Sequence, residues 1–287
     1  MAMQKNILQG AAGGFILTCL MILNGCHEVG PAIDLTDTVY DTYTETPEAP
    51  QPTVVLIEDF TGTNCSTCPT AHEAINATVA AHPGAVAVIA EYNYAGDPLG
   101  TGPLFWTDEA LDLESEYLPV LGWPATFIDR FDFDEDGAPE EVPANILPYT
   151  EQQLLKTPPV NIYLDKTYDT GTRTLDLTVT VKYTSDITTT NHLSVSLVEN
   201  GIITDQLSGA TILTGYEENH ILRKMLTFYL GDALPEENTA GRVYVFHYTY
   251  VVPDGFVAEN MEAIAFVHNF ETGNKEVLQA GSINITD

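Results

Sequence analysis

Apolar positions follow two different periods along the chain, and the first covers residues 53–157. Short apolar runs typical of buried strands alternate there with stretches whose apolar residues recur at helical spacing. Ala71, Ala74 and Ile75, for example, lie on one side of a helix that Pro83-Gly84 ends. The pattern predicts strands at 54–60, 85–92 and 125–131, and helices at 66–81, from Thr107 through Tyr117, and at 148–156. Strands and helices in this order predict an α/β layer with crossover connections.

Beyond Pro158-Pro159 the period of the pattern becomes two. Leu175, Leu177, Val179 and Val181 alternate with polar residues, as expected for a half-buried strand. Such runs predict seven strands, at 160–164, 173–183, 193–198, 221–230, 243–251, 262–268 and 276–283. Short strands separated by turn residues, without a clear helix, indicate an all-β sandwich of immunoglobulin-like type over residues 158–287.

The charge of the chain excludes some classes of partner. The 287 residues contain 41 Asp and Glu against 10 Lys and Arg, a formal net charge of −31. Nucleic acid is not an expected partner, because phosphate binding needs a basic surface. Simple electrostatic attraction to anionic lipid is excluded on the same ground.

The first 52 residues read as targeting and tethering segments. Lys5 precedes a short apolar stretch, and Leu23-Asn24-Gly25-Cys26 resembles a bacterial lipobox. We therefore expect a lipoprotein signal peptide at 1–25 and lipidation of Cys26; the alternative is an ordinary signal peptide with an incidental cysteine. Residues 26–52 are acidic and proline-rich without a periodic pattern, and are expected to form a disordered tether to the membrane.

Cys65 and Cys68 form the pair with the clearest chemical meaning. Cys19 lies in the expected signal peptide and Cys26 is the expected lipid site, so no framework of structural disulfides remains. Cys-x-x-Cys at the junction of a strand and a helix places thiols beside unpaired backbone N–H groups and the positive end of the helix dipole. Both stabilise the reactive thiolate. A redox pair is the leading interpretation; a metal site and an inert pair are the alternatives.

Three stretches resemble thioredoxin-like proteins: Asp59-Phe60, the Cys-x-x-Cys segment and Gly122-Trp123-Pro124. The resemblance implies that Cys65 attacks, that Cys68 resolves the mixed disulfide, and that Asp59 exchanges a proton with Cys68. Pro124 would be a cis-proline opposite the cysteines. The alternatives are a structural role for Asp59 and an ordinary trans turn at Pro124. The chain departs from thioredoxins at Asn64, where tryptophan is usual, and at Ser66-Thr67.

Two weaker patterns suggest cations, but neither leads us to expect a metal or another cofactor. His72 follows Cys68 by one helical turn, so these side chains and Cys65 could bind Cu(I). Asp132, Asp134 and Asp136-Gly137 match half of a calcium loop, but Pro143 stands where its bidentate acid belongs. A solvated acidic turn is the favoured interpretation of the second pattern.

Taken together, the motifs resemble the outer-membrane-protein-28-related lipoproteins of Bacteroidetes. The markers are Glu58 to Pro69 with His72, Gly122-Trp123-Pro124, and three later stretches, which are Asn219 to Arg223, Ala265-Phe266-Val267 and Glu276 to Ala280. His220 and Arg223 are assigned no functional role. The resemblance implies a lipid-anchored envelope protein with a thioredoxin-like domain at 53–157 and a β-sandwich at 158–287.

The expected function is thiol–disulfide exchange with the thiols or disulfides of exported proteins at the outer membrane. The alternative is a non-enzymatic surface binding protein that uses the β-sandwich for recognition, with the thioredoxin-like domain as scaffold.

Overall fold

The computed structural model describes residues 40–92, 105–135, 137–235 and 237–286. They belong to one compact unit, which extends from Leu35 to Asp287. The expected signal peptide, the lipidation of Cys26 and the tether up to residue 39 lie outside the described residues. No helix in the described ranges is long and apolar enough to cross a membrane.

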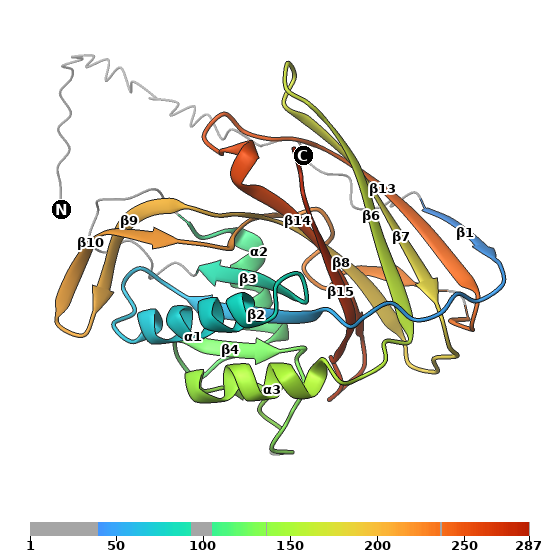
Figure 1. Ribbon diagram of the computed structural model, residues 1–287, viewed down its shortest axis with the longest axis horizontal. Coiled ribbons are helices and arrows are strands. Elements are labelled where there is room, and N and C mark those ends of the chain that lie inside the picture. Colours follow the sequence, from blue (N-terminus) through green and yellow to red (C-terminus); the bar gives the residue numbers. More distant parts are fainter. Residues whose placement is uncertain (1–39, 93–104, 136, 236, 287) are drawn as a thin grey trace, which may run out of the picture. The chain divides into compact units, whose positions relative to one another are not determined.

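The described part of the chain is mostly β-sheet with few helices (Figure 1). Its strands are β1 (Tyr40–Thr44), β2 (Val55–Thr61), β3 (Val86–Tyr92), β4 (Ala125–Ile128), β5 (Glu140–Glu141), β6 (Val160–Asp169), β7 (Thr174–Tyr183), β8 (Asn191–Glu199), β9 (Ile202–Ser208), β10 (Thr211–Glu218), β11 (Ile221–Met225), β12 (Asp232–Leu234), β13 (Arg242–Val251), β14 (Met261–Asn269) and β15 (Val277–Asn284). Its helices are α1 (Cys68–Ala81), α2 (Asp108–Asp112) and α3 (Ile146–Gln153). Short 3₁₀ turns lie at Pro143–Asn145 and Ala258–Asn260.

Strand β2 is the centre of the first half of the fold. It pairs in parallel with β3 and antiparallel with β4, and every one of its residues is buried. Helices α1 and α3 cover one face of these strands, where Ile57 packs with Ile75 and Ile146 (Figure 1). On the other face Leu56 belongs to a cluster that includes residues of α2 and of the strands β8 and β14. Burial on both faces places polar residues of β2 inside the protein.

The expected elements of this half are confirmed, with shifted ends. Helix α1 starts at Cys68 rather than at residue 66, and α3 covers Ile146–Gln153 rather than 148–156. The Thr107 hydroxyl accepts a hydrogen bond from the Ala110 N–H (3.1 Å), so Thr107 is the helix cap that its position predicts. Helix α2 is short, however, and continues as a π-helical turn, Leu113–Tyr117. Strand β4 ends at Ile128 because Asp129 and Arg130 adopt positive φ angles of 49° and 52°, which are not strand conformations.

All seven strands expected after residue 158 are present, although β11 ends at Met225 rather than near residue 230. One four-stranded sheet has the order β1-β13-β7-β6. Alternate residues of β7, namely Leu175, Leu177, Val179 and Val181, point into a large core shared with β8 and β14. The predicted alternation of β7 therefore marks its core-facing side.

The second sheet does not stop at the expected domain boundary. Its strands have the order β15-β14-β8-β11-β3-β2-β4-β5, with β12 added beside β8. The two halves join where β11 runs parallel to β3, with Ile221 opposite Ala90. The Ala90 N–H also donates to the His220 carbonyl (2.8 Å). One sheet and one compact unit thus extend across Pro158-Pro159.

The expectation of a disordered tether up to residue 52 is wrong for residues 40–52. Strand β1 pairs with β13, and Tyr40 packs against Tyr244 and Phe246 with ring centroids 5.8 and 5.3 Å away. The carboxylate of Glu48 binds Lys182 and accepts a hydrogen bond from Tyr163. Aromatic burial and ion pairing therefore order a segment whose composition alone favours disorder.

The hairpin of β9 and β10 was not predicted. Most of β10 is exposed, including Ile212 and Leu213, so no buried face imposes a period-two pattern. The hairpin forms a separate two-stranded sheet beside the loop that precedes α1 (Figure 1). It supplies part of the candidate site.

Candidate redox site

The cysteine pair is present as a disulfide, Cys65–Cys68, with the Cα atoms 5.3 Å apart. Cys68 is the first residue of α1, and its backbone N–H donates to Cys65 Sγ (3.1 Å). A helix-start donor therefore points at the sulfur that would carry the negative charge after reduction. Cys68 is completely buried and Cys65 is 8% exposed, so Cys65 is the more accessible of the two.

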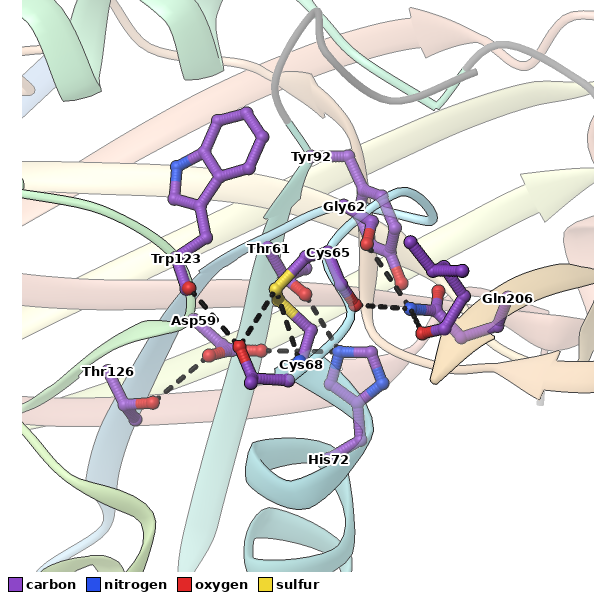
Figure 2. Close-up of a disulfide and its surroundings, with 12 residues drawn as sticks. Asp59, Thr61, Gly62, Cys65, Cys68, His72, Tyr92, Trp123, Thr126 and Gln206 are labelled. Carbon is purple, nitrogen blue, oxygen red and sulfur yellow. Dashed lines mark hydrogen bonds and ion pairs between the residues drawn. A yellow bond between two sulfur atoms is a disulfide. The ribbon is translucent and has the colours of Figure 1, made fainter. Parts of the chain in front are cut away.

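The Trp123–Pro124 loop faces the cysteine loop, and its peptide bond is cis, as the resemblance to thioredoxin-like proteins implies. The Thr67 hydroxyl donates to the Trp123 carbonyl (3.5 Å) and lies 3.7 Å from Cys65 Sγ. Figure 2 shows Trp123 beside the disulfide. Leu121, two residues before Trp123, is 98% exposed and leaves an apolar side chain at the edge of this loop.

The β9–β10 hairpin holds the cysteine loop from another side. The Leu207 N–H donates to the Thr63 carbonyl (2.8 Å), and the Gly209 N–H donates to the Ser66 carbonyl (2.9 Å). The buried Gln206 amide adds a hydrogen bond to the Cys65 carbonyl (3.0 Å; Figure 2). Residues more than 140 positions downstream of Cys65 thus fix the conformation of its loop.

Asp59 is a buried carboxyl group in the second half of β2. Its Oδ1 accepts a hydrogen bond from the Thr126 hydroxyl of β4 (3.0 Å), and its Oδ2 lies 3.5 Å from His72 Nε2 (Figure 2). Burial, with a smaller contribution from the negative charge of Glu218, raises the pKa of Asp59 to about 7, against the lowering effect of the Thr126 hydrogen bond. Such a group can take up or release a proton near neutral pH.

His72 lies on α1 one turn after Cys68, and both of its ring nitrogens have partners. Nε2 contacts the Thr61 hydroxyl (2.8 Å), and Nδ1 contacts the Tyr216 hydroxyl (3.1 Å). The second carboxyl group, that of Glu218, lies 3.5 Å from Nδ1. Burial, with a smaller contribution from His220, lowers the pKa of His72 to about 4, so the imidazole is neutral at pH 7.

Glu218 completes this polar group from the end of β10. Its Oε2 accepts a hydrogen bond from the Tyr92 hydroxyl (2.6 Å), and burial raises its pKa to about 7. A small cavity of about 20 Å³ lies beside Asp59, His72, Glu218 and His220. That volume is enough for one water molecule. Within the residues that the structure describes, Asp59 Oδ2 and Glu218 Oε1 have no hydrogen-bond partner.

A second group of buried charges lies on the same strands, where the two halves of the fold meet. Arg130 binds Glu58 through two hydrogen bonds, from Nε (2.7 Å) and Nη2 (2.6 Å). Its guanidinium also lies over the rings of Tyr117 and Phe266, the latter on β14. The Glu58–Arg130 pair is bidentate and buried. Through it and the contact with Phe266, β2 and the end of β4 are held against the sandwich strands.

The structure places Asp59 and Trp123, the residue before Pro124, around the Cys65–Cys68 disulfide (Figure 2). It does not support the copper arrangement, because the His72 nitrogens contact Thr61 and Tyr216. In the described ranges no group of three or more His, Cys, Asp or Glu side chains is placed to hold a metal ion. Asp132 accepts a hydrogen bond from the Gly137 N–H (2.7 Å), and Asp136 is outside the described residues. Arg223 pairs with Glu199 (2.7 Å), a structural role.

Sequence reasoning missed the contributions of β9 and β10 to the site. Gln206, Tyr216 and Glu218 stand in no recognisable motif, and their partners are far away in the chain. Glu218 immediately precedes Asn219 to Arg223, a stretch that marks the family resemblance. This position is the sequence feature that comes closest to indicating Glu218 as a site residue.

The fold and site define a mostly β protein of two joined halves that carries a Cys-x-x-Cys disulfide. The chain belongs to the Omp28 family of outer membrane proteins, whose model matches residues 113–286. The match extends across the expected boundary at residue 158 and begins after the cysteines. Family membership places the chain in the cell envelope, at the outer membrane. A search of curated proteins found no match.

Solved structures support the fold. HBP35 of Porphyromonas gingivalis is similar with a TM-score of 0.67 and 19% identity, over 83% of this chain and 77% of that one. Protein AGR_C_4864 from Agrobacterium tumefaciens is similar with a TM-score of 0.53 and 11% identity, over 83% and 97% of the two chains. A domain of the outer membrane lipoprotein Omp28 from Porphyromonas gingivalis is 24% identical over 45% of this chain and 89% of its own. Its TM-score of 0.32 is too low to support a shared fold.

Proposed function

We propose that this Omp28-family protein carries out thiol–disulfide exchange with exported proteins through Cys65 and Cys68. The observation that carries the proposal is the disulfide at the start of α1, with the Cys68 N–H directed at Cys65 Sγ. The buried carboxyl group of Asp59 and the cis Trp123–Pro124 loop support it. These features favour a thioredoxin-like arrangement of residues 53–157.

In the reducing direction, the Cys65 thiolate attacks one sulfur of a substrate disulfide, and the other substrate sulfur leaves as a thiolate. Cys68 gives its proton to the Asp59 carboxylate and attacks Cys65 Sγ, which re-forms the Cys65–Cys68 disulfide and releases the second substrate thiolate. Both substrate thiolates take protons from solvent. The oxidising direction is the reverse. The substrate loses or gains two electrons, and the cysteine pair takes the opposite change.

The proposal includes an anchor and a place in the cell. We expect Cys26 to carry lipid and to attach the protein to the outer membrane, which brings the redox site to exported thiols or disulfides. The acidic composition of the chain argues against nucleic acid as a partner.

Trapping a mixed disulfide tests the exchange proposal. The Cys68→Ala variant should form an adduct through Cys65 with insulin, used as a defined disulfide probe, because no resolving thiol remains. Dithiothreitol should release the adduct. The matched Cys65→Ala variant should form none, because Cys68 is completely buried. Absence of an adduct with Cys68→Ala, together with a wild-type disulfide inert to dithiothreitol and glutathione, would contradict the proposal.

The low exposure of Cys65 favours a second candidate, a binding protein in which the cysteine pair is structural. Ile203 and Ile212 on the hairpin are 59% and 45% exposed and offer apolar contact area. If this candidate is correct, a Cys65→Ser, Cys68→Ser double variant should fully restore the wild-type phenotype in a strain that lacks the protein. Failure of the folded double variant to do so would favour exchange.

A further inference from the structure

Asp59 makes no direct contact with bulk water. Its carboxyl group is 1% exposed and lies between β4 and α1. Over a full cycle Asp59 returns to Cys68 the proton that it took, but an Asp59 that is ionised when the disulfide is reduced must first take a proton from solvent. The residues around Asp59 therefore have to supply a path.

His72 stands on that path with one carboxyl group at each ring nitrogen. Asp59 Oδ2 is 3.5 Å from Nε2, and Glu218 Oε2 is 3.5 Å from Nδ1 (Figure 2 for the Asp59 side). The His72 side chain is 11% exposed, whereas both carboxyl groups are 1% exposed. A partly exposed imidazole with a carboxyl group near each nitrogen can accept a proton at one nitrogen and donate one from the other.

The arrangement argues against a metal ion at the same place. The two carboxyl groups face opposite nitrogens of one ring, so a single ion cannot contact both of them and the imidazole. The neighbouring cavity of about 20 Å³ has room for one water beside Asp59, His72 and Glu218. That water would satisfy Asp59 Oδ2 and Glu218 Oε1, which lack hydrogen-bond partners among the described residues.

We propose that His72 is a proton relay between Asp59 and solvent, with Glu218 as a second proton-holding group on the far side of the ring. This inference rests on the proposed function, because the relayed proton is the one that Asp59 exchanges with Cys68. His72 acts through Asp59 and does not touch the reacting sulfurs in this account.

During reduction of the protein disulfide, each bond that breaks is matched by one that forms. A reductant thiolate attacks Cys65 Sγ, the S–S bond breaks, and its electron pair goes to Cys68 Sγ. Cys68 takes the proton of the Asp59 carboxylic acid. Where Asp59 is ionised beforehand, His72 has first donated its Nε2 proton to the carboxylate while Nδ1 accepted one from Glu218 or from water. A second thiol of the reductant displaces Cys65 as a thiolate.

Protonation states near pH 7 agree with this route. The pKa values of Asp59 and Glu218 are raised to about 7 by burial, so each carboxyl group can hold or release a proton. Burial lowers the pKa of His72 to about 4, so the ring has one protonated and one free nitrogen. The groups that face His72 come from three places: Asp59 and Thr61 on β2, Tyr216 and Glu218 on β10, and His220 after it.

The test is the rate at which dithiothreitol reduces the disulfide in the purified full-length protein, from pH 5 to pH 9 and over a range of imidazole buffer concentrations. The wild-type rate, corrected for the thiolate fraction of dithiothreitol, should fall as the pH rises through about 7 and should not depend on the buffer. His72→Gln should be slower by at least ~10-fold at low buffer concentration and should be rescued by imidazole. Loss of packing alone would not produce buffer rescue.

Two further variants complete the design. Asp165→Asn is the control, because Asp165 is an exposed carboxyl group on β6, and it should behave as wild type. Glu218→Gln should move the pH dependence to lower pH, since the negative charge of Glu218 raises the pKa of Asp59. If His72→Gln does not fold, His72→Asn decides the question by the same buffer-rescue measurement.

The outcomes separate the two proposals. If wild type is reduced and forms the Cys65 adduct, but His72→Gln keeps the wild-type rate without any buffer effect, then the relay is wrong and the exchange function stands. An unshifted pH profile in Glu218→Gln would remove Glu218 from the relay. A wild-type disulfide that is not reduced at all would overturn both proposals.

Discussion

Asp59→Asn is expected to stabilise the folded protein at neutral and alkaline pH by up to about 4 kcal/mol and to leave its stability at pH 4 nearly unchanged. The carboxyl group has an ordinary pKa of 3.8 and a folded-state pKa of about 7, because burial disfavours its charge. Asparagine keeps an oxygen that can accept the Thr126 hydrogen bond and cannot ionise.

The direction with pH follows from the raised pKa. Below about pH 3.8 Asp59 is protonated in the folded and the unfolded chain, and its stabilising contribution is fully present. Between this pH and about 7 the unfolded chain ionises first, so wild-type stability falls with rising pH and levels off above 7. The stability of Asp59→Asn does not fall in this way with rising pH, because asparagine does not ionise.

Urea unfolding at pH 4, 6 and 8 measures the difference. Asp165→Asn, at an exposed carboxyl group on β6, is the matched control and should parallel wild type. Parallel curves for Asp59→Asn and wild type at all three pH values would show that Asp59 does not hold a raised pKa in the folded protein.

Arg130→Met is expected to destabilise the protein by about 3–5 kcal/mol, since it leaves Glu58 buried without its partner. Glu58 makes two hydrogen bonds to the guanidinium, and both side chains are 1% exposed. Glu91 lies in the same buried group, where burial and the charge of Glu58 raise its pKa.

A double variant separates the lost pair from lost packing. Arg130→Met with Glu58→Met should recover part of the loss, because no unpaired carboxylate remains at position 58. Arg242→Met, at a partly exposed site on β13, should cost less than 1 kcal/mol, on the order of a surface contact. A loss for Arg130→Met no larger than that of Arg242→Met would contradict the assigned role of the Glu58–Arg130 pair.

Periodicity was sufficient where one face of an element is buried. The alternation of Leu175 to Val181 predicts β7 because those side chains fill the core of the sandwich. Ala110, Leu113 and Tyr117 mark a buried face in the same way, even though the chain there changes from an α-helix to a π-helical turn. The positions of Cys65, Asp59 and Pro124 were predictable through their resemblance to known motifs.

The remainder depends on contacts that no local pattern encodes. The exposed side chains of β10 leave the hairpin without a period, and its Gln206 and Glu218 meet Cys65 and His72 only after folding. The segment from Tyr40 to Glu48 reads as a tether until Tyr244 and Lys182 are available as partners. The raised pKa of Asp59 likewise follows from burial of all of β2 by both halves of the fold.

The most direct test of the central claim is the reduction potential of Cys65–Cys68 in the full-length protein. The protein is equilibrated in glutathione and dithiothreitol redox buffers, free thiols are alkylated, and the peptides with Cys65 and Cys68 are quantified separately from those with Cys19 and Cys26. An exchangeable pair should be reduced reversibly with a midpoint between about −270 and −120 mV. A midpoint below about −300 mV, or no reduction, would identify the bond as a structural cross-link and contradict the account.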